Sequence, residues 1–390
     1  MPQPMTSKQR LWAALSGEQP DHVPIWMLYP RERLSYYADV YTEPSYTPII
    51  GDIRARTDWL DRRSIPSAPY YTAATEIEHD VETGNGWTIT HSTLHTPRGD
   101  LTAEHRQDEE NAAGARTEHF CKTIDDLDKV LSIPYQPVEP DMTAFNEAAS
   151  KLGDDGLMMI NIGMPIGAAY GLAHPENFAL WTLTERERLL HFTHTIFERA
   201  VEFWQKALDA GAGPVFFAVG TEFVAPPMCS PKSFDALITP FDAPLFDMIH
   251  SHGGRVIVHH HGNISGILER IADLGADGIQ PIEEPPIGDC TFADAKRRIG
   301  VGSDRARETG HGVCLVGTVQ YDDFERLTPD GMEALVKRQI GDAAPGGGLI
   351  LAPTAGPYAA NLTERQQANH LRFIEAGHKW GEYPLDWIAE

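Results

Sequence analysis

The 390-residue sequence has few cysteines, no glycine-rich phosphate loop and no long apolar run. Its four cysteines are scattered without CxxC spacing, which is typical of a reducing compartment and excludes a zinc site built from cysteine alone. Neither GxGxxG nor GxxxxGK occurs, so an open doubly wound sheet with a phosphate loop after its first strand is not favoured. No window approaches the roughly 18 uninterrupted apolar residues of a membrane-spanning helix.

Basic residues are also scarce. Lys and Arg total 32 against 56 for Asp and Glu, which gives a formal net charge of −24. This balance argues against attraction to nucleic-acid backbones or anionic lipid, so we expect neither nucleic acid nor a membrane surface as a partner. The first residues lack the pattern of a secretion signal, and we expect a cytoplasmic protein.

From about residue 155 onward, short apolar runs alternate with longer amphipathic segments, which is typical of successive βα units. A further strand is predicted at residues 23–27, after a helix at residues 8–15. Helices are expected between the strands, and residues 175–209 are long enough for two. The other predicted strands are residues 157–162, 214–220, 255–261, 278–282, 313–319 and 348–353. This order predicts an α/β fold, a TIM-like (β/α)8 barrel.

Residues 36–134 interrupt the alternation. Residues 86–95 alternate as in a strand, and residues 96–100 resemble a turn that leads to a second strand at residues 101–105. No linker rich in Gly, Ser or Pro separates this stretch from the rest. We therefore predict one domain over residues 1–390, with an N-terminal β-hairpin insertion near one mouth of the barrel, rather than a separate N-terminal domain.

The strongest chemical signal is the run of three histidines at positions 259–261, at the end of a predicted strand. Because side chains alternate along a strand, His259 and His261 share one face, while His260 faces the helices. Two imidazoles on one face can bind one divalent metal such as zinc. The alternative is a hydrogen-bonded polar cluster without metal.

A metal site needs further ligands, and carboxylates end the neighbouring strands. Glu222 follows the preceding strand and would complete a site of two histidines and one carboxylate. Glu283 ends the next strand and is the rival, together with Glu284. A buried carboxylate is costly without a partner, so at least one of them should meet the histidines.

Other polar residues close further strands, where the catalytic groups of such barrels lie. Asn161, Thr318 and Thr354 are candidates for substrate binding. Near the predicted first strand, Tyr29 is a candidate proton carrier and Arg31 a candidate substrate ligand. The alternative for the arginines of this segment is an ordinary solvated surface.

The segments SHGGRVIVHHHGN (251–263), LGADGIQPIEEPPIGD (274–289) and AKRRIG (295–300) resemble the uroporphyrinogen decarboxylase superfamily. The opening residues 6–25 and the segments 230–234 and 347–353 are similar to it as well. The resemblance covers nearly the whole chain and implies a TIM-like barrel. The superfamily contains porphyrinogen decarboxylases, which need no metal, and zinc-dependent methyltransferases that work with a corrinoid.

The sequence departs from both groups. The arginine-rich run of the decarboxylases is replaced by WMLYPRER at residues 26–33, so porphyrin decarboxylation is not expected. Relative to the methyltransferases, His259 matches the first zinc ligand, His261 replaces a cysteine, and residues 353–355 lack the last cysteine. A metal ion held without thiolate ligands is a harder Lewis acid, so the site is suited to an oxygen donor as well as to a thiol.

The resemblance and the histidines together predict a metal-dependent methyltransferase or demethylase acting on a small substrate. The metal would be a Lewis acid on the substrate heteroatom, with Glu222, Glu283 or Tyr29 handling a proton. A corrinoid, or a corrinoid protein, would be the methyl partner. One alternative is a metal-assisted lyase, decarboxylase or hydrolase of a small carboxylated molecule. The other is a non-catalytic corrinoid- or ligand-binding protein.

Overall fold

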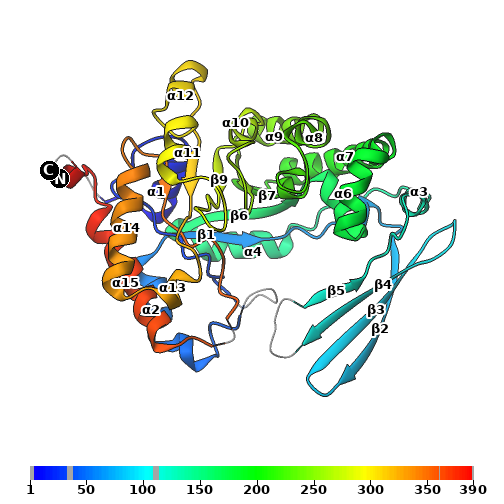
Figure 1. The fold of residues 1–390 in the computed structure, drawn as a ribbon, viewed down its shortest axis with the longest axis horizontal. Coiled ribbons are helices and arrows are strands. Elements are labelled where there is room, and N and C mark those ends of the chain that lie inside the picture. Colours follow the sequence, from blue (N-terminus) through cyan, green and yellow to red (C-terminus); the bar gives the residue numbers. More distant parts are fainter. Residues whose placement is uncertain (1–3, 33–37, 109–113, 360, 389–390) are drawn as a thin grey trace.

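A computed structural model describes residues 4–32, 38–108, 114–359 and 361–388 (Figure 1). Within them, a 7-stranded sheet has the order β1-β6-β7-β8-β9-β10-β11, and all its pairings are parallel. Its strands are β1 (Trp59–Arg63), β6 (Gly156–Gly163), β7 (Val215–Val219), β8 (Arg255–His259), β9 (Gly278–Gln280), β10 (Cys314–Val316) and β11 (Leu349–Ile350). Each strand pairs with the next strand of the sheet along the chain, as in a barrel built from βα units.

A short N-terminal segment lies between the two edges of this sheet. On one side, the Leu351 N–H donates to the Pro24 carbonyl at 2.9 Å. On the other side, the Asp58 N–H donates to the Ile25 carbonyl at 2.7 Å. The segment therefore joins β11 to β1, as expected for a TIM-like barrel. In place of the strand predicted at residues 23–27, the structure has a single parallel bridge there, between Ile25 and Leu351.

Helices cover the outside of the barrel (Figure 1). The predicted pair within residues 175–209 is confirmed as α6 (Pro175–Thr184) and α7 (Arg186–Asp209). The other helices are α1 (Ser7–Leu15), α2 (Thr47–Arg56), α3 (Asp125–Leu131), α4 (Thr143–Leu152), α5 (Pro165–Leu172), α8 (Pro231–Leu237), α9 (Thr239–Ser251), α10 (Leu268–Asp273), α11 (Phe292–Arg298), α12 (Asp304–Thr309), α13 (Asp323–Arg326), α14 (Pro329–Ala343) and α15 (Glu364–Trp380).

Alternate side chains of the strands build two separate cores. The inner core fills the barrel with residues such as Leu60, Met159, Phe217 and Ile257. The outer core, which includes Ile160, lies between the strands and the helices. Because the strand period is two residues, the face of each later residue on these strands follows from these positions.

Helix α1 closes the amino-terminal end of the barrel, where Leu11 and Leu15 join the inner core. Arg10 of this helix forms a buried ion pair of 2.7 Å with Asp58, just before β1. The same carboxylate accepts a hydrogen bond of 2.9 Å from the Ile25 N–H. Asp58 therefore ties the helix, the closing segment and β1 together.

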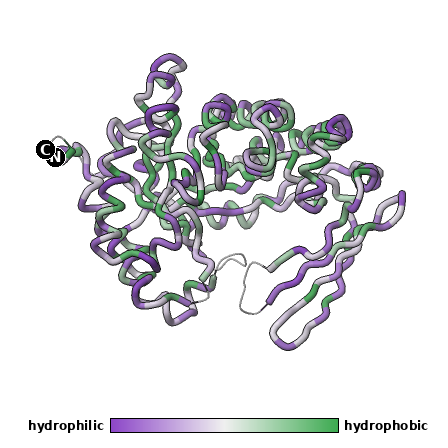
Figure 2. The backbone as a smooth tube through the Cα atoms, in the orientation of Figure 1, coloured by the Kyte–Doolittle hydropathy of each residue, from purple (hydrophilic) through white to green (hydrophobic). Residues whose placement is uncertain are grey.

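Residues 36–134, which interrupt the predicted alternation of strands and helices, form an insertion in part. The predicted hairpin is confirmed within a 4-stranded antiparallel sheet. This sheet stands apart from the barrel, away from the chain termini (Figure 1), and carries long hydrophilic stretches (Figure 2). Its strands are β2 (Glu76–Gly84), β3 (Trp87–His95), β4 (Leu101–Asp108) and β5 (Ala115–Glu118).

The prediction is wrong for α2 and β1, which belong to the barrel although they lie inside the excursion. The sequence of β1, WLDRR, has only two apolar residues, so it lacks the apolar run that marks the other barrel strands. Leu94, Leu101 and Ala103 of the 4-stranded sheet belong to the same outer core as Ile160 of β6. The inserted sheet thus projects from the barrel but shares the outer core through these residues.

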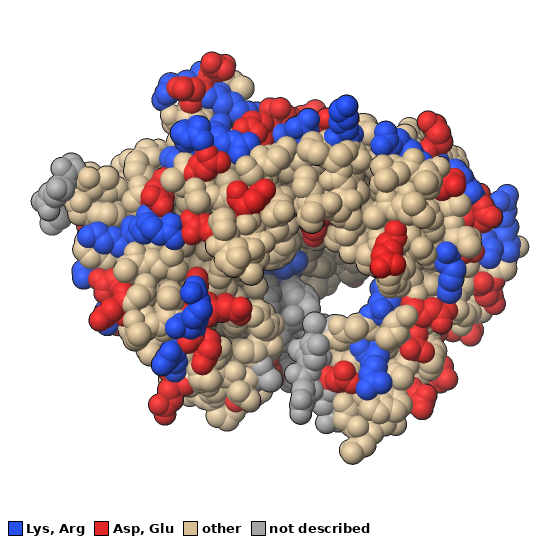
Figure 3. Space-filling model, in the orientation of Figure 1, with Lys and Arg blue, Asp and Glu red and all other residues tan. Residues whose placement is uncertain are grey.

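The surface is mixed in charge. Figure 3 shows acidic and basic side chains interspersed over the visible face, with a hollow between the barrel and the 4-stranded sheet. No helix in the described ranges combines the length and the apolar character needed to cross a membrane.

Candidate functional site

The three histidines lie at the carboxyl end of β8, and their faces are as predicted. His259 continues the inward register of Ile257, and its ring lies 4.9 Å from that of Phe217 in the inner core. The ring of His261 lies 4.6 Å from that of His259 at an interplanar angle of 88°. His260 points the other way, where its Nδ1 lies 3.1 Å from the Thr221 hydroxyl.

A buried glutamine fixes the orientation of His259. The Gln280 side-chain amide donates through Nε2 to the Thr354 carbonyl at 3.1 Å. Its Oε1 must then be the acceptor for His259 Nδ1, which lies 2.6 Å away. Burial, with smaller effects of His261 and Arg62, lowers the pKa of His259 to about 3. The ring is therefore neutral, with its proton on Nδ1 and a lone pair on Nε2.

A buried carboxylate anchors His261. Glu283 Oε1 lies 3.2 Å from His261 Nδ1, and its Oε2 accepts the Gly262 N–H at 2.7 Å. Burial alone would raise the pKa of Glu283, but the hydrogen bonds from His261 and Gly262 outweigh it and lower that pKa. The carboxylate is thus ionised at neutral pH. The expectation that at least one carboxylate meets the histidines is confirmed.

Glu222 follows β7 in a short helical turn (Thr221–Val224). Its carboxylate accepts the Gly220 N–H at 3.1 Å. Burial raises the pKa of Glu222, and His261 is close enough to oppose that shift. Glu222 therefore lies near the histidines, but its carboxylate accepts a hydrogen bond from the backbone at the start of its own turn.

The structure places two further polar residues, Arg62 and Gln280, at the end of the barrel where the histidines lie, and neither was predicted from the sequence. Arg62 follows the inward-facing Leu60 on β1, lies 4.7 Å above the Phe217 ring, and donates from Nε to the Asn161 side-chain oxygen. It was missed because β1 was not recognised. Gln280 was missed because it lies in the middle of the strand predicted at residues 278–282, whereas in the structure β9 ends at Gln280.

The predicted substrate residues Asn161, Thr318 and Thr354 all lie at strand ends, and each is held by the framework. Asn161 also donates to the Ser64 hydroxyl at 3.0 Å. The Thr318 hydroxyl donates to the Ile282 carbonyl, and the Thr354 hydroxyl donates toward the Gln320 side chain at 3.3 Å. Thr318 also lines a cavity of about 530 Å³ between the strand ends and α14.

Tyr29 and Arg31 are not brought to this mouth. Tyr29 lies in the outer core, where its ring packs 6.0 Å from those of Tyr46 and His370. Burial raises the pKa of Tyr29 well above its usual value. Arg31 forms an ion pair of 2.7 Å with Asp155, which precedes β6. The predicted roles are corrected on this point, because the chain turns outward after the closing segment.

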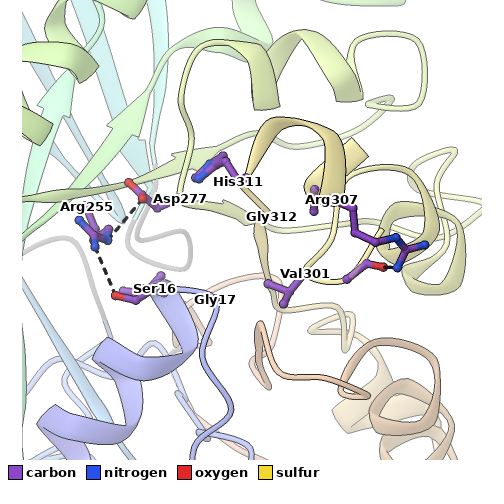
Figure 4. Close-up of a pocket in the computed structure, with 12 residues that line it drawn as sticks. Ser16, Gly17, Arg255, Asp277, Val301, Arg307, His311 and Gly312 are labelled. Atoms are coloured by element: carbon purple, nitrogen blue, oxygen red, sulfur yellow. Dashed lines mark hydrogen bonds and ion pairs between the residues drawn. The ribbon is translucent and has the colours of Figure 1, made fainter. Parts of the chain in front are cut away.

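A second pocket, of about 280 Å³, lies at the opposite end of the barrel. Arg255, the first residue of β8, lies between Asp277 and Ser16 there (Figure 4). The Asp277 carboxylate also accepts the Val256 N–H at 2.7 Å and pairs with His250 at 2.8 Å. These contacts tie the amino ends of the strands to α1 and α9, a structural arrangement at the stability face of such barrels.

In the part of the chain that the structure describes, no group of three His, Cys, Asp or Glu side chains is arranged to hold a metal ion. The mouth does bring together two imidazoles whose Nδ1 atoms are both engaged. Nε2 is the other nitrogen of each ring, and it can bind a metal ion or a ligand through its lone pair when Nδ1 carries the proton. Such a pair can bind a Lewis acid or exchange a proton with a ligand.

The sequence places the chain in a known family. The family model for uroporphyrinogen decarboxylase matches residues 105–380. The chain belongs to the uroporphyrinogen decarboxylase family, in agreement with the barrel and with the resemblance of its motifs. No curated protein matches the chain in sequence.

Solved structures support the fold. A methyltransferase from Methanosarcina mazei matches with a TM-score of 0.58 at 18% identity, over 96% of this chain and 99% of that one. A D-psicose 3-epimerase crystallised with D-fructose reaches a TM-score of 0.32 at 12% identity, over 60% of this chain and 92% of that chain. The first likeness shows a shared fold, and the second is too weak to inform the site.

Proposed function

We propose that this protein is a metal-dependent methyl-transferring enzyme that removes a methyl group from a small oxygen-bearing substrate. The observation that carries the proposal is the pair His259 and His261, with rings 4.6 Å apart at the carboxyl ends of the barrel strands. Membership in the family and the fold shared with a methyltransferase support it.

Two of the residues present, His259 and His261, are suited to a divalent metal such as zinc. A metal-binding histidine commonly donates its other ring N–H to a carboxylate or carbonyl, which fixes the tautomer. The Gln280 side-chain oxygen accepts such a hydrogen bond from His259, and the Glu283 carboxylate accepts one from His261. His259 and His261 would hold the ion, and Glu222 is the proposed third protein ligand. When bound, the ion would supply Lewis acidity toward the substrate oxygen.

The chain's own residues have separate tasks. Gln280 and Glu283 orient the imidazoles and keep their Nε2 atoms toward the mouth. Phe217 packs against His259 and excludes water from that side. Burial raises the pKa of the Glu222 carboxyl, which is the direction that favours a role as a proton carrier. A corrinoid is the proposed methyl acceptor, free or on a partner protein.

The test is methyl transfer to free cob(I)alamin. Zinc-loaded protein is incubated with methoxyacetate or with its sulfur counterpart, methylthioacetate, and methylcobalamin is followed by its absorbance. We expect methylcobalamin from the oxygen compound, and His259→Ala should abolish it. A clear preference for the sulfur compound would contradict the oxygen-donor assignment. No methyl transfer from either, with carbon dioxide released from the acids, would favour the lyase alternative.

A further inference from the structure

We propose that the cavity of about 530 Å³ between the strand ends and α14 binds a small uncharged molecule that carries a carboxamide on an apolar body. Its walls come from the loops after β9 and β10 and from α13 and α14. His259, His261, Glu222 and Glu283 are not among its lining residues. The inference therefore goes beyond the proposed methyl transfer and does not depend on it.

A buried glutamine of the cavity wall lacks a hydrogen-bond partner. Gln339 lies on α14 one turn after Leu335, and both residues line the cavity. Gln339 is only 1% exposed, and its Oε1 accepts no hydrogen bond from the residues that the structure describes. A buried acceptor without a partner is costly, so a ligand group that donates a hydrogen bond to it is bound favourably.

A second glutamine of the cavity, Gln320 in the loop after β10, lacks an acceptor. The Thr354 hydroxyl donates to its Oε1 at 3.3 Å, which orients the amide and leaves Nε2 as its donor. This Nε2 is buried and has no acceptor in the described part of the chain. The two glutamines thus call for a ligand that both donates and accepts hydrogen bonds. A carboxamide does both through its N–H and carbonyl groups.

The charged side chains of this cavity favour an uncharged ligand, because each of them already has a partner. The pairs are Arg338 with Glu284 at 2.7 Å, Arg326 with Asp323, and Tyr358 with Asp322. An anion or a cation would have to compete with one of these partners for its place. An uncharged amide leaves all of the pairs intact.

The rest of the cavity wall is apolar. Pro285, Pro286 and Ile287 from the loop after β9 line it together with Leu327 and Leu335. The Ile287 side chain is 55% exposed, so part of this apolar surface faces solvent. Covering that surface with an apolar group is favourable. A concave site of this size with apolar walls and a few polar groups is typical of small-molecule binding.

Three probes of similar shape test this inference: benzamide, acetophenone, which lacks the N–H groups, and benzoate, which is charged. Ligand-observed NMR titrations of the full chain measure their affinities. We expect benzamide to bind about twofold to tenfold more tightly than acetophenone, the range for one neutral hydrogen bond, and benzoate to bind most weakly. Gln339→Met should remove the preference for benzamide over acetophenone. Gln205→Met on α7, whose amide donates to Asp209 at 3.0 Å, is the control and should keep it.

Equal affinity for benzamide and acetophenone, benzoate binding as tight as that of benzamide, or no binding of any probe would overturn the inference. An unchanged preference in Gln339→Met would also overturn it. Thermal unfolding checks the variant itself: because the Gln339 Oε1 has no partner, Gln339→Met should unfold at a midpoint no lower than that of the parent. A clear fall of the midpoint would show that Gln339 is a structural residue and would contradict the proposal.

Discussion

Oε1 of Glu283 lies 3.2 Å from Nδ1 of His261, and the carboxylate is almost entirely buried beneath that half-exposed ring. Its other oxygen accepts the Gly262 N–H, so the carboxylate is fixed from two sides. A carboxylate held in this way orients the imidazole and increases its basicity toward a metal. Glu283 thus acts on the proposed metal through His261.

Glu283→Gln should weaken zinc binding by about tenfold to a hundredfold, the usual effect of losing such a partner. The adjacent Glu284 is the control, because it pairs with Arg338 on α14 at 2.7 Å. Competition with a chelator measures both affinities. Equal zinc affinity of Glu283→Gln and Glu284→Gln would contradict the role assigned to Glu283.

Asp58→Ala should destabilise the protein by about 2–3 kcal/mol, because it removes one of the two ion pairs of Arg10, which keeps Asp21 at 2.7 Å, and frees the Ile25 N–H. Denaturant unfolding measures the change. The control is Asp52→Ala on α2, which removes an exposed pair with Arg56 and should cost less than about 1 kcal/mol. Similar losses in both variants would show that Asp58 does not fasten the barrel closure.

Asp242 of α9 is fully buried, and neither of its carboxylate oxygens has a hydrogen-bond partner among the described residues. Burial raises the pKa of Asp242 well above its usual value. The folded protein therefore holds a proton that the unfolded chain releases above about pH 4, so stability falls as the pH rises from there toward the folded pKa.

Asp242→Asn removes this titration. We expect the variant to be more stable than the parent at pH 7, by about 1–3 kcal/mol, with a smaller difference at pH 4.5. Unfolding midpoints across this range measure the effect. A difference that does not change with pH would rule out a buried titrating carboxyl at this position.

The region of residues 36–134 remains predicted to be part of one domain. Its β1 is a barrel strand, and Leu94 of its inserted sheet shares the outer core with Ile160. Limited proteolysis of the intact protein should therefore not release a stable fragment from either side of this region. Recovery of two independently folded pieces would contradict a single domain.

The barrel was predictable because most of its strands are continuous apolar runs, and strand period alone placed His259 and His261 together on one face. The β1 strand was not predictable in this way, since WLDRR carries three charged residues. Because β1 was not predicted as a strand, Arg62 was not recognised as a residue at this end of the barrel. Periodicity could not show that the chain turns outward beyond the closing segment, which carries Tyr29 and Arg31 away from the mouth. Nor could it choose between Glu222 and Glu283, because that depends on loop geometry.

The central claim is that His259 and His261 together hold a divalent metal. The most direct test is the zinc content of the purified, dialysed protein and of its three histidine-to-alanine variants. We expect close to one zinc per chain in the parent and in His260→Ala, whose imidazole faces Thr221, and loss of zinc in His259→Ala and His261→Ala. Retention of zinc by the latter two, or equal loss in all three, would contradict the account.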